Sequence, residues 1–391
     1  MNPMRTDFSR LDVSRLPSPC WVVDEVAIQQ NLAILNEVGR RSGAKVLAAL
    51  KAFSLFELAP HYRNQLWGTC SSGLHEALLA QEFYPGERHV FSAAYSESDL
   101  EQILPIADHI VFNSVPQWLR FKSVCLSAQQ HRPNLSFGLR INPEHSEGDI
   151  PLYDPCAPGS RLGITASELT PGILEGINGL HFHTLCEHLF EPLARTVAAV
   201  EARFGHLFAQ LEWINFGGGH HITHPDYDRE ALISLIQTFR NQYKLEVYLE
   251  PGEAIAIGTG VLVSEVLDLR PAADMEQAIL DTSATCHMPD TLEMPYRADI
   301  LGAGQPEEYA YTYRLGGLTC LAGDTMGCYS FTEPLELGQK VLFLDMSHYT
   351  MVKTSTFNGT KLPAIAIWNS EADTVKLVRE FGYQDFRDRL S

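Results

Sequence analysis

Basic residues are scarce in this chain: its 391 residues include 29 lysines and arginines against 48 aspartates and glutamates, a formal net charge of −19. Binding to nucleic acid requires clustered lysine and arginine to neutralise phosphates, so this balance excludes a nucleic-acid partner. An acidic protein is compatible with a cationic small-molecule substrate. The deficit of basic residues therefore narrows the class of ligand without identifying it.

Cysteine pairs and long apolar runs are also missing. The eight cysteines form no Cys-x-x-Cys pair, which argues against a zinc ribbon or a thioredoxin motif, and their density is too low for a disulfide scaffold. No run reaches membrane-spanning length, and the first residues contain no apolar segment of the kind found in secretion signals. We therefore expect a cytoplasmic protein with no membrane partner.

Short apolar runs alternate with helix-like stretches over residues 25–250. Such alternation is typical of βα units in a parallel sheet, and eight units in succession predict a TIM-type (β/α)8 barrel. After about Val261, short apolar segments separated by turn residues predict a mostly β domain. The expected domains are the α/β barrel at 25–260 and a β-rich domain made of 1–24 and 261–391. The predicted barrel strands are 46–51, 65–70, 89–94, 109–113, 136–142, 179–183, 213–217 and 246–250.

Polar or glycine-rich residues follow these predicted strands at one end. In a (β/α)8 barrel the carboxyl ends of the strands carry the active site. Lys51 ends the first strand, and a lysine there either extends to solvent or is held neutral at the barrel mouth as a nucleophilic amine. The clustering of polar residues at this end of the strands favours a functional role for Lys51. The residues at or just past these strand ends are Lys51, Ser71, Ser72, Asn113, Arg140, His183, Gly217–Gly219 and Glu250.

Several of these strand-end residues suit a planar, phosphorylated cofactor, although each also has a structural interpretation. The glycines Gly217–Gly219 can close on a phosphate or simply form a tight turn. Glu250 can accept from a protonated ring nitrogen or pair with a structural cation, and His183 can lie against a planar ring or be a core histidine. Together with the amine of Lys51, they match the requirements of pyridoxal 5′-phosphate.

The remaining candidates are less specific. Cys320 is either reactive or a buried, inert thiol, and Tyr349 either donates to a phosphate or fills the core. His220, His221 and His224 are potential metal ligands, but no carboxylate lies at a recognisable spacing from them. We therefore predict no metal.

Four motifs together resemble those of a known family. They are Leu50-Lys51-Ala52-Phe53, His181-Phe182-His183-Thr184-Leu185-Cys186-Glu187, Gly217-Gly218-Gly219-His220-His221 and Glu250-Pro251-Gly252-Glu253. In this order they resemble the fold-type III pyridoxal-phosphate decarboxylases, the group of ornithine and diaminopimelate decarboxylases with an alanine-racemase-like barrel. Within that group the similarity is greatest to enzymes acting on carboxynorspermidine or carboxyspermidine. The resemblance implies pyridoxal 5′-phosphate as cofactor, a carboxylated polyamine as substrate and a homodimer with shared active sites.

The resemblance also implies a role for individual residues. It implies that Cys320, entering from the other subunit, reprotonates the carbon that has lost carbon dioxide. The implied cofactor contacts are the covalent lysine Lys51, the ring-stacking His183, the nearby Arg140, the phosphate loop Gly217, Gly218 and Gly219, the ring-nitrogen partner Glu250 and the phosphate donor Tyr349.

Two departures from the ornithine and diaminopimelate enzymes bear on the substrate. Those enzymes have arginine at the position of Glu253 and an acidic residue at that of Leu321. A carboxylate is repelled by a phosphate, so we expect Glu253 to bind a substrate ammonium. Asp290, in the irregular stretch 286–306, is our candidate for the distal amine, with a solvated loop aspartate as the alternative. Asp324 is a further acidic candidate.

Two other functions remain open from the sequence. Diaminopimelate or ornithine decarboxylation is disfavoured by Glu253 and Leu321. A non-catalytic, regulatory relative is disfavoured because this chain keeps Lys51, Cys320 and the glycine loop.

Overall fold

The computed structural model describes residues 4–148, 150–170, 172–272 and 275–391. The chain divides into two compact units. One is formed by Gln30–Ile255, and the other combines the residues up to Gln29 with Ala256–Ser391.

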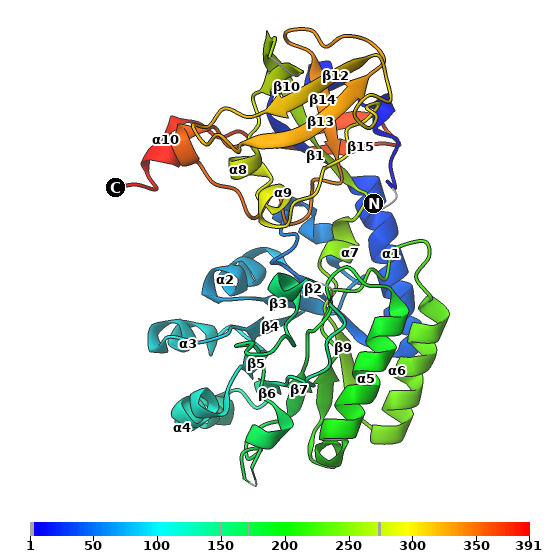
Figure 1. Cartoon of the computed structure of the whole chain (residues 1–391). Helices are drawn as coiled ribbons and strands as arrows, with labels where there is room; N and C mark the ends of the chain where they lie inside the picture. The colour runs from blue at the N-terminus through cyan, green and yellow to red at the C-terminus, as the bar shows by residue number, and fades with distance from the viewer. Residues whose placement is uncertain (1–3, 149, 171, 273–274) are drawn as a thin grey trace. The chain divides into compact units, whose positions relative to one another are not determined.

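In the first unit, eight parallel strands close into a barrel within the described ranges, with β2 paired to β9 (Figure 1). The predicted (β/α)8 barrel is thus confirmed. Most strands end one or two residues earlier than expected, so Lys51, His183 and Gly217 lie in the loops beyond the carboxyl ends. The strands are β2 (Lys45–Ala49), β3 (Gly68–Ser71), β4 (Glu87–Phe91), β5 (His109–Phe112), β6 (Ser136–Arg140), β7 (Gly179–His181), β8 (Trp213–Asn215) and β9 (Glu246–Leu249).

Amphipathic helices cover the outside of these strands (Figure 1). In α6, Asp228 caps the first turn by accepting from the Ala231 N–H, and Lys244 ends the helix with a left-handed φ of 60° that turns the chain into β9. The helices in this part of the chain are α1 (Glu25–Ser42), α2 (Leu74–Phe83), α3 (Glu97–Ile103), α4 (Val115–His131), α5 (Phe190–Phe204), α6 (Arg229–Tyr243) and α7 (Glu253–Ala256).

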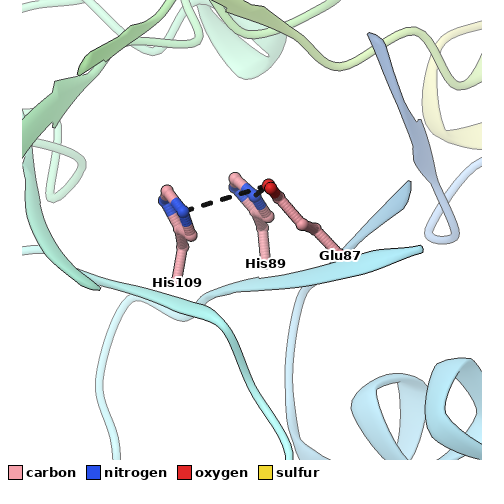
Figure 2. A group of neighbouring side chains, drawn as sticks. All are labelled: Glu87, His89 and His109. Carbon is pink, nitrogen blue, oxygen red and sulfur yellow. Dashed lines mark hydrogen bonds and ion pairs between the residues drawn. The ribbon is translucent and has the colours of Figure 1, made fainter. Parts of the chain in front are cut away.

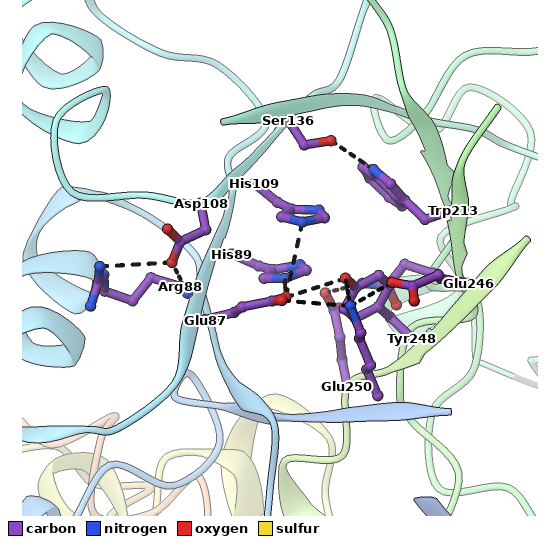
Figure 3. Close-up of polar contacts among 12 residues, drawn as sticks. Glu87, Arg88, His89, Asp108, His109, Ser136, Trp213, Glu246, Tyr248 and Glu250 are labelled. Carbon is purple, nitrogen blue, oxygen red and sulfur yellow. Dashed lines mark hydrogen bonds and ion pairs between the residues drawn. The ribbon is translucent and has the colours of Figure 1, made fainter. Parts of the chain in front are cut away.

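A polar layer fills the barrel interior near the amino ends of the strands (Figure 3). The Lys45 ammonium lies 2.5 Å from Glu246 and 3.6 Å from Glu87, and the Tyr248 hydroxyl donates to Glu87 at 3.2 Å. These contacts join β2, β4 and β9 at the end of the barrel remote from the loops that follow the strands. We assign this layer to stability, as is usual for that end of such barrels.

The second unit is built on one mixed sheet of eight strands, counted over the described residues. Strand β1 pairs antiparallel with β10 and parallel with β15, and β14 adds to β10. The expected β-rich architecture is confirmed. Its helices are α8 (Ala284–His287), α9 (Asp290–Glu293) and α10 (Tyr383–Arg387). Its strands are β1 (Cys20–Asp24), β10 (Gly260–Arg270), β11 (Glu276–Leu280), β12 (Tyr311–Gly316), β13 (Thr325–Phe331), β14 (Lys340–Leu344), β15 (Ala364–Asn369) and β16 (Thr374–Arg379).

Among the described helices, none combines the length and apolar character needed to cross a membrane.

Candidate active site

Lys51 lies just beyond the carboxyl end of β2 and turns toward the barrel mouth. Its Nζ is 3.2 Å from the Nε2 of His183. Burial, and then the positive charge of Arg140, lower the pKa of Lys51. A lysine with a lowered pKa has a larger fraction of neutral, nucleophilic amine at neutral pH. The structure therefore favours the inward amine over a lysine extended to solvent.

The tautomer of His183 follows from its neighbours. The Gly218 N–H donates to Nδ1 at 2.9 Å, so Nδ1 is unprotonated. Burial lowers the pKa of His183 well below its usual value, and the neutral ring must then carry its proton on Nε2. That N–H faces the Nζ of Lys51. Hence His183 is fixed by a backbone donor, not by the backbone carbonyl that a core histidine would use.

The loop after β8 requires glycine, because neighbouring backbone atoms lie too close to it for a side chain. Gly217 and Gly219 have left-handed φ values of 69° and 81°, and a Cβ on Gly218 would lie 2.1 Å from the Glu250 carbonyl oxygen. The N–H of Gly217 donates to Asn215 Oδ1 and that of Gly218 to His183. The N–H groups of Gly217 and Gly218 thus already have acceptors within the protein, and these two glycines shape the loop by close backbone approach.

Glu250 follows β9, and both of its carboxylate oxygens accept hydrogen bonds. His181 Nε2 lies 3.1 Å from Oε2, and Asn215 Nδ2 donates to Oε1 at 2.7 Å. Burial alone would raise the pKa of Glu250, but the contact with His181 and the Asn215 hydrogen bond hold it below the usual range. Glu250 is thus an ionised carboxylate. Sequence reasoning assigned no role to His181 or Asn215, although strand alternation places His181 on the same inward face as His183.

Arg140, the last residue of β6, is buried beside these groups. Its Nη2 donates to the His183 carbonyl at 2.7 Å, and its guanidinium lies 4.6 Å from the Phe91 ring centroid. Burial lowers the pKa of Arg140 to about 10, so it stays charged at neutral pH. Its bond to the His183 backbone places it among the groups expected around a cofactor.

Glu253 begins α7 and has a partner that the sequence did not suggest. Its Oε2 lies 3.2 Å from Nε2 of His221, which is buried, and the Glu253 side chain is 11% exposed. No spacing rule connects these residues, because His221 follows β8 and Glu253 follows β9. The structure thus supplies a carboxylate neighbour for one of the histidines considered as metal ligands.

A different group of donors lies inside the barrel. Donor atoms of Glu87, His89 and His109 all lie within 4.8 Å of one another (Figure 2). An imidazole binds a metal in its own ring plane, but the two rings are stacked, with centroids 4.0 Å apart and an angle of 12°. Rings stacked in this way cannot both direct an in-plane nitrogen lone pair at one nearby ion, and Glu87 is already paired with Lys45 at 3.6 Å. We assign this group to the polar layer and not to a metal centre.

The other predicted residues lie in the second unit. Cys320 is exposed, and its backbone N–H donates to Asn358 Oδ1 at 2.8 Å, so it is not the buried, inert thiol of the alternative. Tyr349 has a left-handed φ of 49°.

Asp290 accepts from Lys353, which also contacts Glu293 at 2.6 Å. Asp290 is therefore an ion-paired carboxylate and not a solvated loop residue.

Asp324 has a different environment, with an exposed fraction of 4%. It accepts from the Ser283 hydroxyl at 2.9 Å, from the Thr285 N–H at 3.2 Å, and from the Thr319 N–H and hydroxyl at 3.0 and 2.7 Å. These donors occupy both oxygens. The contacts favour a structural role for Asp324, holding the loop that carries Cys320, over a contact with substrate.

This assignment predicts different effects for the two aspartates. Asp324→Ala should lower the free energy of unfolding by about 1–3 kcal/mol, because it leaves several buried donors without an acceptor. Asp290→Ala should change it by less than about 1 kcal/mol, as for a partly exposed ion pair. Urea denaturation of both variants measures the difference. Equal destabilisation would contradict the assignment of Asp324.

Comparison with known proteins places the chain in a class. It belongs to the pyridoxal-dependent decarboxylases, because the family model described as "Pyridoxal-dependent decarboxylase, C-terminal sheet domain" matches residues 20–347. The resemblance drawn from the motifs is confirmed.

Individual relatives narrow this class. The chain is 44% identical to the carboxyaminopropylagmatine decarboxylase of Synechocystis sp., covering 97% of this chain and 96% of the relative. It is 41% identical to the carboxynorspermidine/carboxyspermidine decarboxylase of Campylobacter jejuni, covering 95% and 98%. The crystal structure of Campylobacter jejuni carboxynorspermidine decarboxylase complexed with norspermidine matches with a TM-score of 0.88 and 40% identity, over 96% of this chain and all of that one.

Proposed function

We propose that this protein is a pyridoxal-phosphate-dependent decarboxylase of carboxynorspermidine or carboxyspermidine, which it converts to norspermidine or spermidine. The observation that carries the proposal is similarity over nearly the whole chain, at 41% and 37% identity, to two carboxynorspermidine/carboxyspermidine decarboxylases. The two alignments cover 95% and 96% of this chain.

The residues present suit the cofactor. Lys51 supplies an amine of lowered pKa, Glu250 an ionised carboxylate for a protonated ring nitrogen, and His183 a flat, neutral ring. When bound, pyridoxal phosphate supplies an electron sink for the pair released as carbon dioxide leaves. The residues that we propose for holding the cofactor are Lys51, Arg140, His183, the loop Gly217–Gly219, Glu250 and Tyr349.

The substrate would be held by charge. A carboxylated polyamine carries several ammonium groups, and we propose Glu253 and Asp290 as their partners. Electrostatic complementarity would then set the position of the substrate chain in the site. We propose Cys320 as the group that returns a proton to the carbon. The protein would work in the cytoplasm as a homodimer in which the partner's Cys320 completes each site.

Carboxyaminopropylagmatine is a second candidate substrate, favoured by the 44% identity to the Synechocystis enzyme. It differs from the carboxylated polyamines in ending with a guanidinium in place of an ammonium. A guanidinium presents a planar, bidentate fork that an ammonium lacks, so one carboxylate can discriminate between them by geometry.

The test is a side-by-side measurement of kcat/KM on carboxynorspermidine, carboxyspermidine, carboxyaminopropylagmatine, diaminopimelate and ornithine. A carboxylated polyamine should give the highest value. Carboxynorspermidine and carboxyspermidine differ by one methylene, so both should be used, within roughly 10–200-fold of each other. A maximum on diaminopimelate or ornithine would refute the proposal, and a purified holoprotein without visible cofactor absorbance would favour a regulatory relative.

Glu253→Gln should raise KM for the polyamine substrate roughly tenfold or more, because a buried carboxylate that pairs with an ammonium is replaced by a neutral amide. Affinity for pyridoxal phosphate should change much less. Steady-state kinetics and cofactor titration of the same variant separate the two effects. The reverse pattern would assign Glu253 to the phosphate.

A further inference from the structure

We propose that His181 and Asn215 are positioning residues that together hold the Glu250 carboxylate for the ring nitrogen of the cofactor. This inference rests on the proposed role of Glu250. It adds two residues to which the resemblance assigned no role.

The two residues bind opposite oxygens of one carboxylate. His181, the last residue of β7, places Nε2 3.1 Å from Oε2, and Asn215, the last residue of β8, donates from Nδ2 to Oε1 at 2.7 Å. Both have an exposed fraction of 1%, so water does not compete with these bonds. A carboxylate held at both oxygens cannot rotate about its terminal torsion without losing a buried hydrogen bond.

The orientation of the Asn215 amide is fixed independently. The backbone N–H of Gly217 donates to Asn215 Oδ1 at 2.8 Å, so the amide nitrogen must face Glu250. A single side chain therefore connects the glycine loop to the carboxylate. Because these would hold opposite ends of the cofactor, Asn215 sets their mutual position.

The protonation state of His181 follows from the same geometry. Its Nδ1 is buried and meets no hydrogen-bond partner within the described ranges, while Nε2 faces an ionised oxygen. An imidazole nitrogen facing a carboxylate must carry the proton, because two acceptors would repel. Burial lowers the pKa of His181, so the ring is a neutral donor.

Other groups also act on Glu250 and must be included in any pH argument. The polar layer projects into the same barrel interior as Glu250 (Figure 3). In addition to His181 and Asn215, the groups with an electrostatic or hydrogen-bond influence on it are Lys51 after β2, Cys70 of β3, His89 of β4 and Arg140 of β6.

The experiment is equilibrium binding of pyridoxal phosphate to the apo-protein from about pH 5 to about pH 8, for wild type, His181→Phe and His181→Gln. Phenylalanine fills the space but donates nothing, whereas the glutamine amide places an N–H near the position of Nε2. Loss of the donor raises the pKa of Glu250. If binding of pyridoxal phosphate depends on the ionised carboxylate, acidification then weakens binding at a higher pH than in wild type. His181→Phe should bind roughly tenfold more weakly at the acid end, and His181→Gln should recover most of this loss.

Asn215→Asp provides a second arm that does not depend on His181. The aspartate keeps an acceptor for the Gly217 N–H but opposes Glu250 with a second carboxylate, so its affinity should fall with the same pH dependence. His109→Phe is the matched control, because His109 is another buried histidine of the barrel and its ion-pair contact is with Glu87. Its binding curve should equal that of wild type.

The proposal is overturned if His181→Phe and Asn215→Asp bind with the pH dependence of wild type, or if His109→Phe shifts it equally. If His181→Phe does not fold, Asn215→Asp still decides, because a curve with the pH dependence of wild type for that variant would overturn the proposal. Failure of the wild-type protein to bind pyridoxal phosphate would instead refute the proposed function.

Discussion

Lys51→Ala is expected to abolish both decarboxylation and the visible absorbance of the lysine-bound cofactor, with a loss in kcat/KM of roughly 10³-fold or more. The reason is that Lys51 supplies an amine of lowered pKa at the barrel mouth, 3.2 Å from a histidine that faces it with an N–H. Lys45, a second lysine of the barrel interior, is instead ion-paired with Glu246 and Glu87. Absorbance spectra and single-turnover kinetics measure the two losses.

Lys122→Ala is the control for this change, because Lys122 pairs with Glu175 at the surface and should leave spectrum and turnover as in wild type. Borohydride reduction of the holoprotein followed by peptide mapping gives an independent result. A pyridoxyl adduct should be found at position 51. An adduct at a different lysine would refute this assignment even if Lys51→Ala were inactive.

Cys320→Ala is expected to lower kcat by about 10²–10⁴-fold, the range typical for loss of a positioned acid, with little change in KM or in cofactor absorbance. The thiol is exposed on a loop of the second unit, which Asn358 and Asp324 hold through hydrogen bonds. Loss of turnover without loss of the cofactor spectrum distinguishes a proton donor from a residue that binds the cofactor.

The expected sharing of sites adds a complementation test. If each site combines Lys51 of one subunit with the partner's Cys320, refolding Lys51→Ala with Cys320→Ala in equal amounts should restore about a quarter of wild-type activity. Cys328→Ala, which changes a partly buried cysteine of β13, should behave as wild type. No restoration in a mixture shown to contain heterodimers would contradict shared sites.

The barrel was predictable because its strands are continuous apolar runs, and the polar residues at their ends mark one face. This is why Lys51, Arg140, His183 and Glu250 could be selected from the sequence alone. Their hydrogen-bond partners could not. His181, Asn215 and Glu250 come from three different strands, and only the closed barrel determines that their side chains meet.

The same limit applies to charge pairing. From the sequence, Asp290 is the candidate for the distal amine and Asp324 a further acidic candidate. The structure separates them, because both oxygens of Asp324 accept from buried donors whereas Asp290 pairs with Lys353. In the second unit, β16 is hard to recognise from sequence because most of its residues are exposed and its apolar pattern is weak. Strand β13 is hard to recognise because Gly327 and Ser330 interrupt its apolar run.

The glycine loop also limits how this enzyme can be engineered. A methyl group on Gly217, Gly218 or Gly219 would lie 2.3, 2.1 or 1.8 Å from the carbonyl oxygens of Phe182, Glu250 and Leu185, respectively. Even alanine would push apart the loops that follow three neighbouring strands. Libraries intended to widen the substrate range should therefore leave these three codons fixed and diversify other positions.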